Sequence, residues 1–504
     1  MLKAKWFLIL FFLPGIIWGQ KVSLEGNIPE YAGETITFLT FSDQIAFTEK
    51  VLCNVIVNED GSFSCSFETN ETIYVFTHIG IYDAFFYAES GKEYQLLFPE
   101  RKDKTVGDKL NPYFKSVQYH LGIENSDKYE LNYQIAFFDE IYLSIVNQGF
   151  DVTYEKFMEQ RSGNNKAQVD SVLPDGTYTK IIENTTYTIP DNLKQIDFEK
   201  EISKIDSFFA YVDNKFFHDY KTYQLASFRY LANQEKSKSI SDNYFLNQDI
   251  LYHNPAYMGL FNQVYKDYFN YFGRTEEGKK IFSDISFLKS ITALKNTLGQ
   301  DSVLTNNQLK ELVILKCLYD EFYDDKLSRS AMLTVLDSLI LQTGYPEHQL
   351  IGENIRHKVT KLMVGFEPPA FELLDQQGNL VSLQSFQGKY VYLSFCASYS
   401  YGCIKEFEML RTLYQNHKNH FEIVVICMDD SLEQMKSFVE RKGYPFKFLF
   451  YGNQPDIFKE YDIRAFPTYY FIDKNGKLVL SPAPSPDQNA EFSIFKIMRA
   501  NGDI

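Results

Sequence analysis

The chain has 504 residues, of which 45% are hydrophobic, a composition typical of a globular protein long enough for about three domains. Its formal net charge is −16, from 50 basic and 66 acidic side chains. This balance argues against nucleic-acid binding, which needs a concentrated basic face.

Residues 1–19 have the pattern of a secretory signal peptide. Lys3 and Lys5 precede an apolar run that ends at the small residue Gly19, so we expect cleavage before Gln20. The run is short and is interrupted by a Pro-Gly pair, which favours a signal peptide over a membrane anchor. No later segment is apolar and long enough to span a bilayer. We therefore expect an exported protein of the periplasm or cell envelope, where disulfides are permitted.

Residues 20–104 alternate apolar and polar side chains with a period of two, which predicts a small antiparallel β-sandwich. The Asp60-Gly61 pair predicts a hairpin turn. Cys53 and Cys65 flank this turn symmetrically, so they could form a cross-strand disulfide or remain two buried free thiols. The predicted strands are 22–28, 34–41, 50–57, 63–68, 72–79, 84–89 and 94–99.

Residues 105–362 instead show apolar residues three and four apart, the spacing of amphipathic helices. Residues 162–192 lack this periodicity and are rich in turn formers, which predicts a long loop. We interpret the region as a helical spacer or a dimerisation domain. The predicted helical stretches are 131–150, 196–217, 223–233, 277–298, 306–324 and 330–344.

The stretch 389–406, KYVYLSFCASYSYGCIKE, predicts a buried strand at 390–395, an irregular turn, and a helix that begins near Cys403. A cysteine at a helix N-terminus is favoured as the thiolate, because the helix macrodipole is positive there. Residues 363–504 resemble the exported TlpA-like branch of the thioredoxin superfamily, the AhpC/TSA redoxins. In that branch this stretch reads roughly F-W-A-S-W-C-G-P-C, and the matching residues are Phe395, Ala397, Ser398 and Cys403, with Tyr399 replacing an aromatic residue.

The resemblance implies a thioredoxin α/β fold and a thiol–disulfide oxidoreductase, with two departures at the site. Cys396 stands where Trp is usual, and Ser400 stands where the attacking cysteine should be. The resemblance also implies a cis bond between Phe466 and Pro467, facing the active site. Substrate contacts would come from these two residues together with Tyr399 and Thr468.

Three interpretations of the site stay open, because disulfide exchange needs a thiolate and a second thiol. In the first, Cys403 is the thiol, Ser400 donates a hydrogen bond to it, and Cys396 is its partner. Against this, Cys396 could simply fill the space left by Trp. In the second, the site resembles a peroxiredoxin, with Ser400 three residues before a lone Cys403, although Thr468 stands where that family has an arginine. In the third, the domain is a non-catalytic scaffold that binds peptides.

Neither a metal nor a cofactor is expected. The eight histidines are scattered, and the one close pair, His417 and His420, lacks partners at metal-ligand spacing. We expect Cys317 and Cys427 to be buried free thiols in a helix and a strand. The expected partner is a protein or peptide, in the redox interpretation one that carries a thiol or disulfide.

Overall fold

The computed structural model describes residues 19–105, 108, 111, 114–161, 198–232, 236–324, 326–454 and 456–504; for 147–161, 198–199 and 453 it describes the backbone alone. The predicted signal peptide, except Gly19, and the predicted loop 162–192 lie outside the described residues. Within the described ranges, no helix combines the length and the apolar character needed to cross a membrane.

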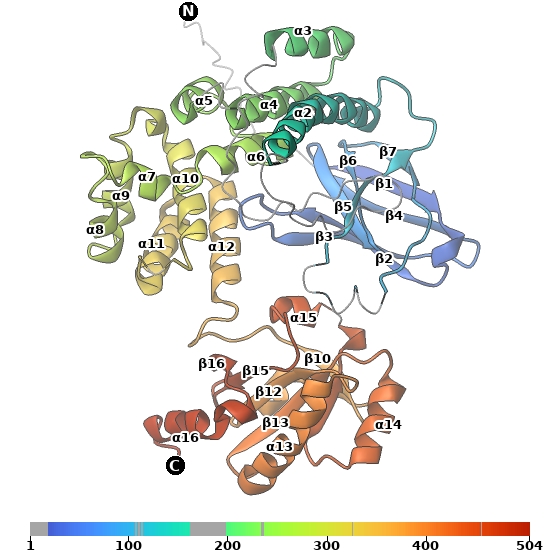
Figure 1. The fold of residues 1–504 in the computed structure, drawn as a ribbon, viewed down its shortest axis with the longest axis vertical. Coiled ribbons are helices and arrows are strands. Elements are labelled where there is room, and N and C mark those ends of the chain that lie inside the picture. Colours follow the sequence, from blue (N-terminus) through green and yellow to red (C-terminus); the bar gives the residue numbers. More distant parts are fainter. Residues whose placement is uncertain are drawn as a thin grey trace, which may run out of the picture. The chain divides into compact units, whose positions relative to one another are not determined.

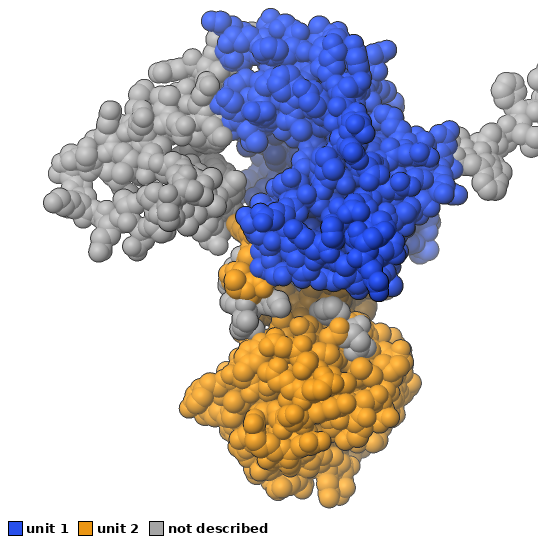
Figure 2. Space-filling model, turned by 90° about the vertical axis from the view of Figure 1, so that its right-hand side faces the viewer, with its two compact units in different colours: residues 1–103, 116–354 blue, residues 104–115, 355–504 orange. Residues whose placement is uncertain are grey.

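The chain divides into two compact units, which Figure 2 colours separately. The first unit comprises residues 1–103 and 116–354, and the second comprises residues 104–115 and 355–504. The predicted β and helical regions thus belong mostly to one unit. The boundaries 20–104, 105–362 and 363–504 stay predictions.

The strands of the first unit form two sheets (Figure 1). In its described part, one sheet has the order β4-β1-β7-β9 and the other has the order β3-β2-β5-β6-β8. Buried side chains from both sheets, such as Val22, Phe38 and Phe86, share one core. The strands are β1 Gln20–Asn27, β2 Thr35–Phe41, β3 Glu49–Ile56, β4 Ser62–Thr69, β5 Ile73–Ile79, β6 Tyr82–Ala88, β7 Glu93–Leu97, β8 Val117–His120 and β9 Gly122–Ile123.

Two features of these sheets correct the sequence prediction. The sheets are not wholly antiparallel, because β1 pairs with β7 in parallel and β6 pairs with β8 in parallel. Strands β8 and β9 also fall within the range predicted to be helical. Parallel neighbours need a long connection, and local alternation of side chains cannot show which distant strand will become a neighbour.

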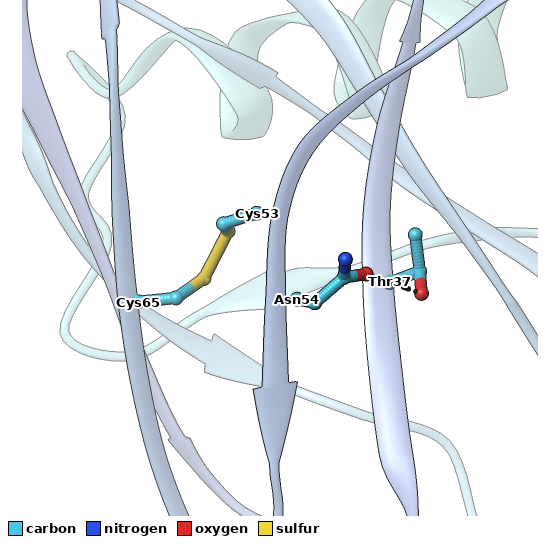
Figure 3. The surroundings of a disulfide bond; sticks show 4 residues. All are labelled: Thr37, Cys53, Asn54 and Cys65. Atoms are coloured by element: carbon cyan, nitrogen blue, oxygen red, sulfur yellow. Dashed lines mark hydrogen bonds between the residues drawn. A yellow bond between two sulfur atoms is a disulfide. The ribbon is translucent and has the colours of Figure 1, made fainter.

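The disulfide between Cys53 and Cys65 is formed, with their Cα atoms 6.3 Å apart (Figure 3). It does not link two strands of one hairpin sheet. Cys53 lies on β3 and Cys65 on β4, and each of these strands is the edge of a different sheet. The bond therefore joins the two sheets at their edges, beside the hydrogen bond from the Thr37 hydroxyl to Asn54 Oδ1 (2.7 Å).

The predicted helical region is largely helical as expected, and it is attached to the β part by side-chain hydrogen bonds. Asn262 Nδ2 donates to the Gln44 carbonyl at 2.9 Å, and Asn354 Nδ2 donates to Asp43 Oδ2 at 2.8 Å. The helices are α2 Leu131–Arg161, α3 Phe198–Phe208, α4 Lys215–Leu231, α5 Ser237–Tyr244, α6 Pro255–Val264, α7 Tyr268–Phe272, α8 Ile281–Ser286, α9 Ile291–Leu298, α10 Asn307–Asp320, α11 Arg329–Gln342 and α12 Pro346–Thr360.

The second unit is built on one sheet with the order β11-β10-β14-β13-β12-β15-β16. Strands β12, β13 and β14 are parallel, whereas β10 and β15 run antiparallel to their neighbours β14 and β12. The strands are β10 Glu372–Asp375, β11 Leu380–Ser382, β12 Tyr390–Cys396, β13 Phe421–Cys427, β14 Lys447–Phe450, β15 Thr468–Ile472 and β16 Leu478–Ala483. The helices are α13 Tyr401–His417, α14 Leu432–Lys442, α15 Ile457–Glu460 and α16 Ala490–Ala500.

Each face of this sheet has its own core, because successive side chains of a strand point to opposite faces. Tyr392 and Cys396 of β12 belong to the core that includes side chains of α13, α14 and α16. Leu393 and Phe395 belong to the core on the other face, with Ile457 of α15. This alternation directs Cys396 toward the helix that carries Cys403.

Candidate active site

The candidate site lies where β12 ends and α13 begins, joined by residues 397–400. Strand β12 is fully buried and pairs with β13 on one side and β15 on the other. The predicted strand and helix are both confirmed. Ser400 is the N-cap residue of α13, although its side chain makes no capping hydrogen bond.

Cys403 and Cys396 are free thiols, and neither sulfur-bearing side chain has exposed surface. Both side chains lie in the core on the α13 face of the sheet, and the interaction between the two thiols shifts the pKa of each. The Ala397 N–H donates to Cys403 Sγ at 3.4 Å, and the Ser394 hydroxyl lies 3.3 Å from Cys396 Sγ. The structure therefore brings together the two cysteines that the first interpretation requires, as a thiol pair without a disulfide.

The two thiols are not equivalent. The interaction with the Cys396 thiol is the largest cause of the lowered pKa of Cys403, and the Ala397 N–H and the Ser400 hydroxyl lower it further. Burial acts in the opposite direction and is outweighed. Burial and the same interaction raise the pKa of Cys396 well above its ordinary value. The first turn of a helix also favours a thiolate. The favoured charged form is therefore a Cys403 thiolate stabilised by the Cys396 thiol.

The predicted substrate-contact residues lie on both sides of the helix start. The Phe466–Pro467 bond is cis, as predicted. A Cβ built on Gly402 would lie 3.5 Å from Pro467 Cδ and 3.6 Å from the Phe466 carbonyl oxygen, so the Pro467 loop abuts the first turn of α13. Both of these loop residues are half-buried.

Two other predicted contacts differ in exposure. Tyr399 is 43% exposed at the turn, so its ring is available at the surface. Thr468 is half-buried, and its hydroxyl donates to the Ala465 carbonyl at 2.7 Å, within its own loop. The peroxiredoxin interpretation would need an arginine beside the sulfur, but the nearby Arg464 pairs with Asp462 on the same loop, with Nε 3.1 Å from Oδ1.

Two buried acids near the site were not singled out from the sequence. Glu406, one turn after Cys403, accepts a hydrogen bond from the Tyr469 hydroxyl at 2.6 Å, and burial raises its pKa. Asp429 follows β13, and its Oδ1 accepts the Ser398 N–H at 2.8 Å. A signal for Asp429 existed in the sequence: it lies two residues after a buried strand, and the ends of neighbouring parallel strands meet at one sheet edge.

Two further cysteines and the close histidine pair were also considered from the sequence. Cys317 and Cys427 are buried free thiols, as predicted, and burial raises the pKa of each well above its ordinary value. His417 pairs with Glu491, with Nε2 2.7 Å from Oε1. Among the described residues, no group of three or more His, Cys, Asp or Glu side chains is arranged to hold a metal ion.

Comparison with known proteins places the second unit in a family. The AhpC/TSA family matches residues 364–481. Thiol-disulfide oxidoreductase ResA of Bacillus thuringiensis subsp. konkukian is 33% identical over 124 residues, covering 24% of this chain and 70% of that protein. Peroxiredoxin Q of Sedum lineare is 36% identical over 160 residues, covering 30% of this chain and 83% of that protein.

Among solved structures, the thioredoxin domain of a thiol-disulfide oxidoreductase from Bacteroides vulgatus is 28% identical. The match covers 27% of this chain and 96% of that domain, with a TM-score of 0.25. The identity and coverage of the ResA relative, together with the family match, decide the assignment. The chain therefore belongs to the thioredoxin superfamily, as a TlpA-like protein with an AhpC/TSA-type domain at its C-terminal end.

Proposed function

We propose that this protein handles thiols and disulfides of protein partners through Cys403 and Cys396, with Ser-x-x-Cys in place of Cys-x-x-Cys. The observation that carries the proposal is the burial of two free thiols in the same core, Cys396 at the end of β12 and Cys403 in the first turn of α13. Their mutual interaction lowers the pKa of Cys403 and raises that of Cys396. Such a pair supplies both requirements of disulfide exchange, a stabilised thiolate and a second thiol that can resolve a mixed disulfide.

The proposed reaction passes two electrons from the thiol pair to a partner disulfide. The Cys403 thiolate attacks one sulfur of the partner, forming a mixed disulfide and releasing the partner's other sulfur as a thiolate, which takes up a proton. Cys396 then loses its proton and attacks Cys403, which releases the partner's second sulfur. The products are a Cys396–Cys403 disulfide and a partner dithiol, and the reverse sequence oxidises a partner.

Ser400 and the Pro467 loop would act as positioning elements. The Ser400 hydroxyl helps to lower the pKa of Cys403 but is too poor a nucleophile toward sulfur to replace the missing cysteine. An extended partner segment would lie along Phe466, Pro467 and Thr468, beside the exposed ring of Tyr399.

Export to the periplasm or cell envelope is part of the proposal. The disulfide between Cys53 and Cys65 supports it, because such bonds persist in oxidising compartments. The test is N-terminal sequencing of the protein from a periplasmic fraction, where we expect Gln20 as the first residue. A mature chain that keeps residues 1–19 and stays in the cytoplasm would contradict this part.

The central test uses the reduced protein in glutathione buffers of graded redox potential, quenched with acid and mapped by mass spectrometry. We expect a linked Cys396–Cys403 peptide to appear as the buffer becomes more oxidising, and to be absent in Cys396→Ala and Cys403→Ala. Cys427→Ala is the matched control, since it removes a buried thiol of the same core and should leave the link intact.

The other outcomes separate the alternatives. Consumption of hydrogen peroxide with a sulfenic acid on Cys403, surviving Cys396→Ala, would support a single-cysteine peroxidase instead. A Cys403 that stays reduced in every buffer and reacts only after denaturation would support a binding scaffold. Either result would overturn the redox proposal.

A further inference from the structure

Asp429 is a buried carboxyl at the edge of the thiol site that the reaction above does not use. It is 1% exposed and lies two residues beyond the end of β13. Its Oδ1 accepts the Ser398 N–H at 2.8 Å. Its Oδ2 is enclosed and has no hydrogen-bonding partner among the residues that the structure describes.

Such a group is costly to keep in the fold. Burial raises the pKa of Asp429, hydrogen bonds from Ser398 oppose this effect, and the charge of Asp430 adds to it. A buried polar atom without a hydrogen-bonding partner destabilises the fold, and local violations of this kind concentrate at functional sites. The adjacent strand ends are otherwise apolar, so a carboxyl here calls for an explanation.

The bond to Asp429 fixes the segment 397–400 that joins the two thiol-bearing elements. The Ala397 N–H of this segment points at Cys403 Sγ, and the Ser400 N–H donates to the Ala397 carbonyl at 3.1 Å. Cys396 directly precedes the segment, and its carbonyl accepts a hydrogen bond at 2.9 Å from the N–H of Met428, the residue that follows β13. Strands β12 and β13 lie side by side here, as Figure 1 shows.

The two thiols are enclosed, and segment 397–400 contacts the Cys403 sulfur through the Ala397 N–H. Ala397 and Ser398 are buried, and the sulfurs of Cys396 and Cys403 have no exposed surface, so a partner's sulfur cannot reach them in this arrangement. The strand and the helix on either side are held by regular backbone hydrogen bonds and by the core. The four-residue connection belongs to neither element, and the hydrogen bonds named above, from the N–H groups of Ala397, Ser398 and Ser400, hold it in place.

We propose that Asp429 is a positioning residue that holds segment 397–400 closed over the Cys396–Cys403 pair, and that release of the Ser398–Asp429 hydrogen bond admits the partner's sulfur. This inference rests on the proposed thiol–disulfide function. Asp429 does not touch the reacting atoms, and it acts through the position of the segment.

The test compares Asp429→Ala, Asp429→Asn and Asp430→Ala in the full-length reduced protein. Asp430 is the adjacent exposed acid and serves as the matched control. The readouts are the rate of iodoacetamide labelling of Cys403 across a pH series and hydrogen exchange of segment 397–400. We expect Asp429→Ala to label about tenfold faster or more, equivalent to about 1.4 kcal/mol less protection. Asp429→Asn should stay near the wild-type rate, because its side-chain oxygen still accepts the Ser398 N–H.

Access and ionisation are distinguished by the shape of the pH profile. An opened segment raises the labelling rate at every pH without moving the midpoint of the profile, and it speeds hydrogen exchange at 397–400 while β12 stays protected. Equal labelling of Asp429→Ala and wild type would overturn the inference. Faster exchange throughout β12 would also overturn it, since Asp429 would then merely stabilise the domain.

Failure of the inference is separable from failure of the proposed function. If Asp429→Ala changes nothing while the Cys396–Cys403 disulfide forms in glutathione buffer, the function stands and the positioning role is wrong. If Asp429→Ala speeds labelling and local exchange but no disulfide forms in any variant, the segment opens as proposed and the redox function is wrong.

Discussion

Replacing Cys396 with alanine is the sharpest perturbation of the thiol site. Interactions with three groups lower the pKa of Cys403, namely the Cys396 thiol, the Ala397 N–H and the Ser400 hydroxyl. Cys396→Ala removes the first of these, which is the largest cause of the lowered pKa. Alanine leaves the strand geometry intact and loses one sulfur atom from the core, so the fold should persist.

The expected size of the effect follows from the strength of one donor. A hydrogen bond to a charged group contributes about 1.5–3 kcal/mol, and a thiol is a weak donor, so we take the lower end of that range. Since about 1.4 kcal/mol corresponds to one pKa unit, the pKa of Cys403 should rise by about one. Below the pKa, a rise of one unit lowers the thiolate fraction on which the proposed attack depends by about tenfold.

The pKa is measured from the ultraviolet absorbance of the thiolate during a pH titration, which does not require a reagent to reach the buried sulfur. Cys317 and Cys427 do not interfere near neutral pH, because burial raises their pKa values well above the ordinary one. Cys427→Ala is the control and should leave the titration unchanged. An unchanged midpoint in Cys396→Ala would refute the reasoning that Cys396 stabilises the thiolate.

Three further predictions concern the first unit. Burial raises the pKa of Asp139 to about 7, so the folded state keeps a proton that the unfolded state loses near pH 4, and the free energy of unfolding falls as pH rises between these values. In urea denaturation, Asp139→Asn should show a weaker dependence of this free energy on pH than wild type. The same dependence in both proteins would contradict the prediction. Mutating Cys53 and Cys65 to serine should lower the free energy of unfolding by about 3 kcal/mol, from the entropy of the loop that the disulfide closes; a urea midpoint that does not move would argue that the bond is dispensable. Glu311 is buried, which alone would raise its pKa, yet hydrogen bonds, including one from His348 at 3.0 Å, lower it to about 2. Glu311→Gln should therefore cost about 3 kcal/mol at neutral pH and progressively less below pH 4, and a cost independent of pH would contradict the assignment.

Much of the site could be predicted from the sequence, because its local determinants are written in neighbouring residues. The buried run at 390–395, the turn and the helix near Cys403 follow from hydrophobic period and helix-start preferences. The cis bond at Pro467 was implied by the resemblance and is confirmed. The same local logic predicted the strands around the Asp60-Gly61 turn.

What only the tertiary structure decided concerns partners that are distant in the chain. The turn at Asp60-Gly61 could be predicted from the sequence. However, β3 pairs with β2 and β4 pairs with β1, which places β3 and β4 in different sheets. Only these pairings make the disulfide between β3 and β4 a link between the two sheets. The contact of Cys396 with Cys403 depends on which sheet face α13 covers. The burial of Asp429 likewise depends on the packing of β13 against β12.

The physical reason for this division lies in the range of the interactions. Backbone preferences and side-chain alternation act over a few residues, so the sequence by itself determined the elements, the cysteine at the helix start and the serine in place of the attacking thiol. Burial and hydrogen-bond partners arise from surfaces that meet only in the folded chain. The burial of Cys403 and Cys396 in one core, and the hydrogen bond from the Ser398 N–H to Asp429, were therefore decided by tertiary packing alone.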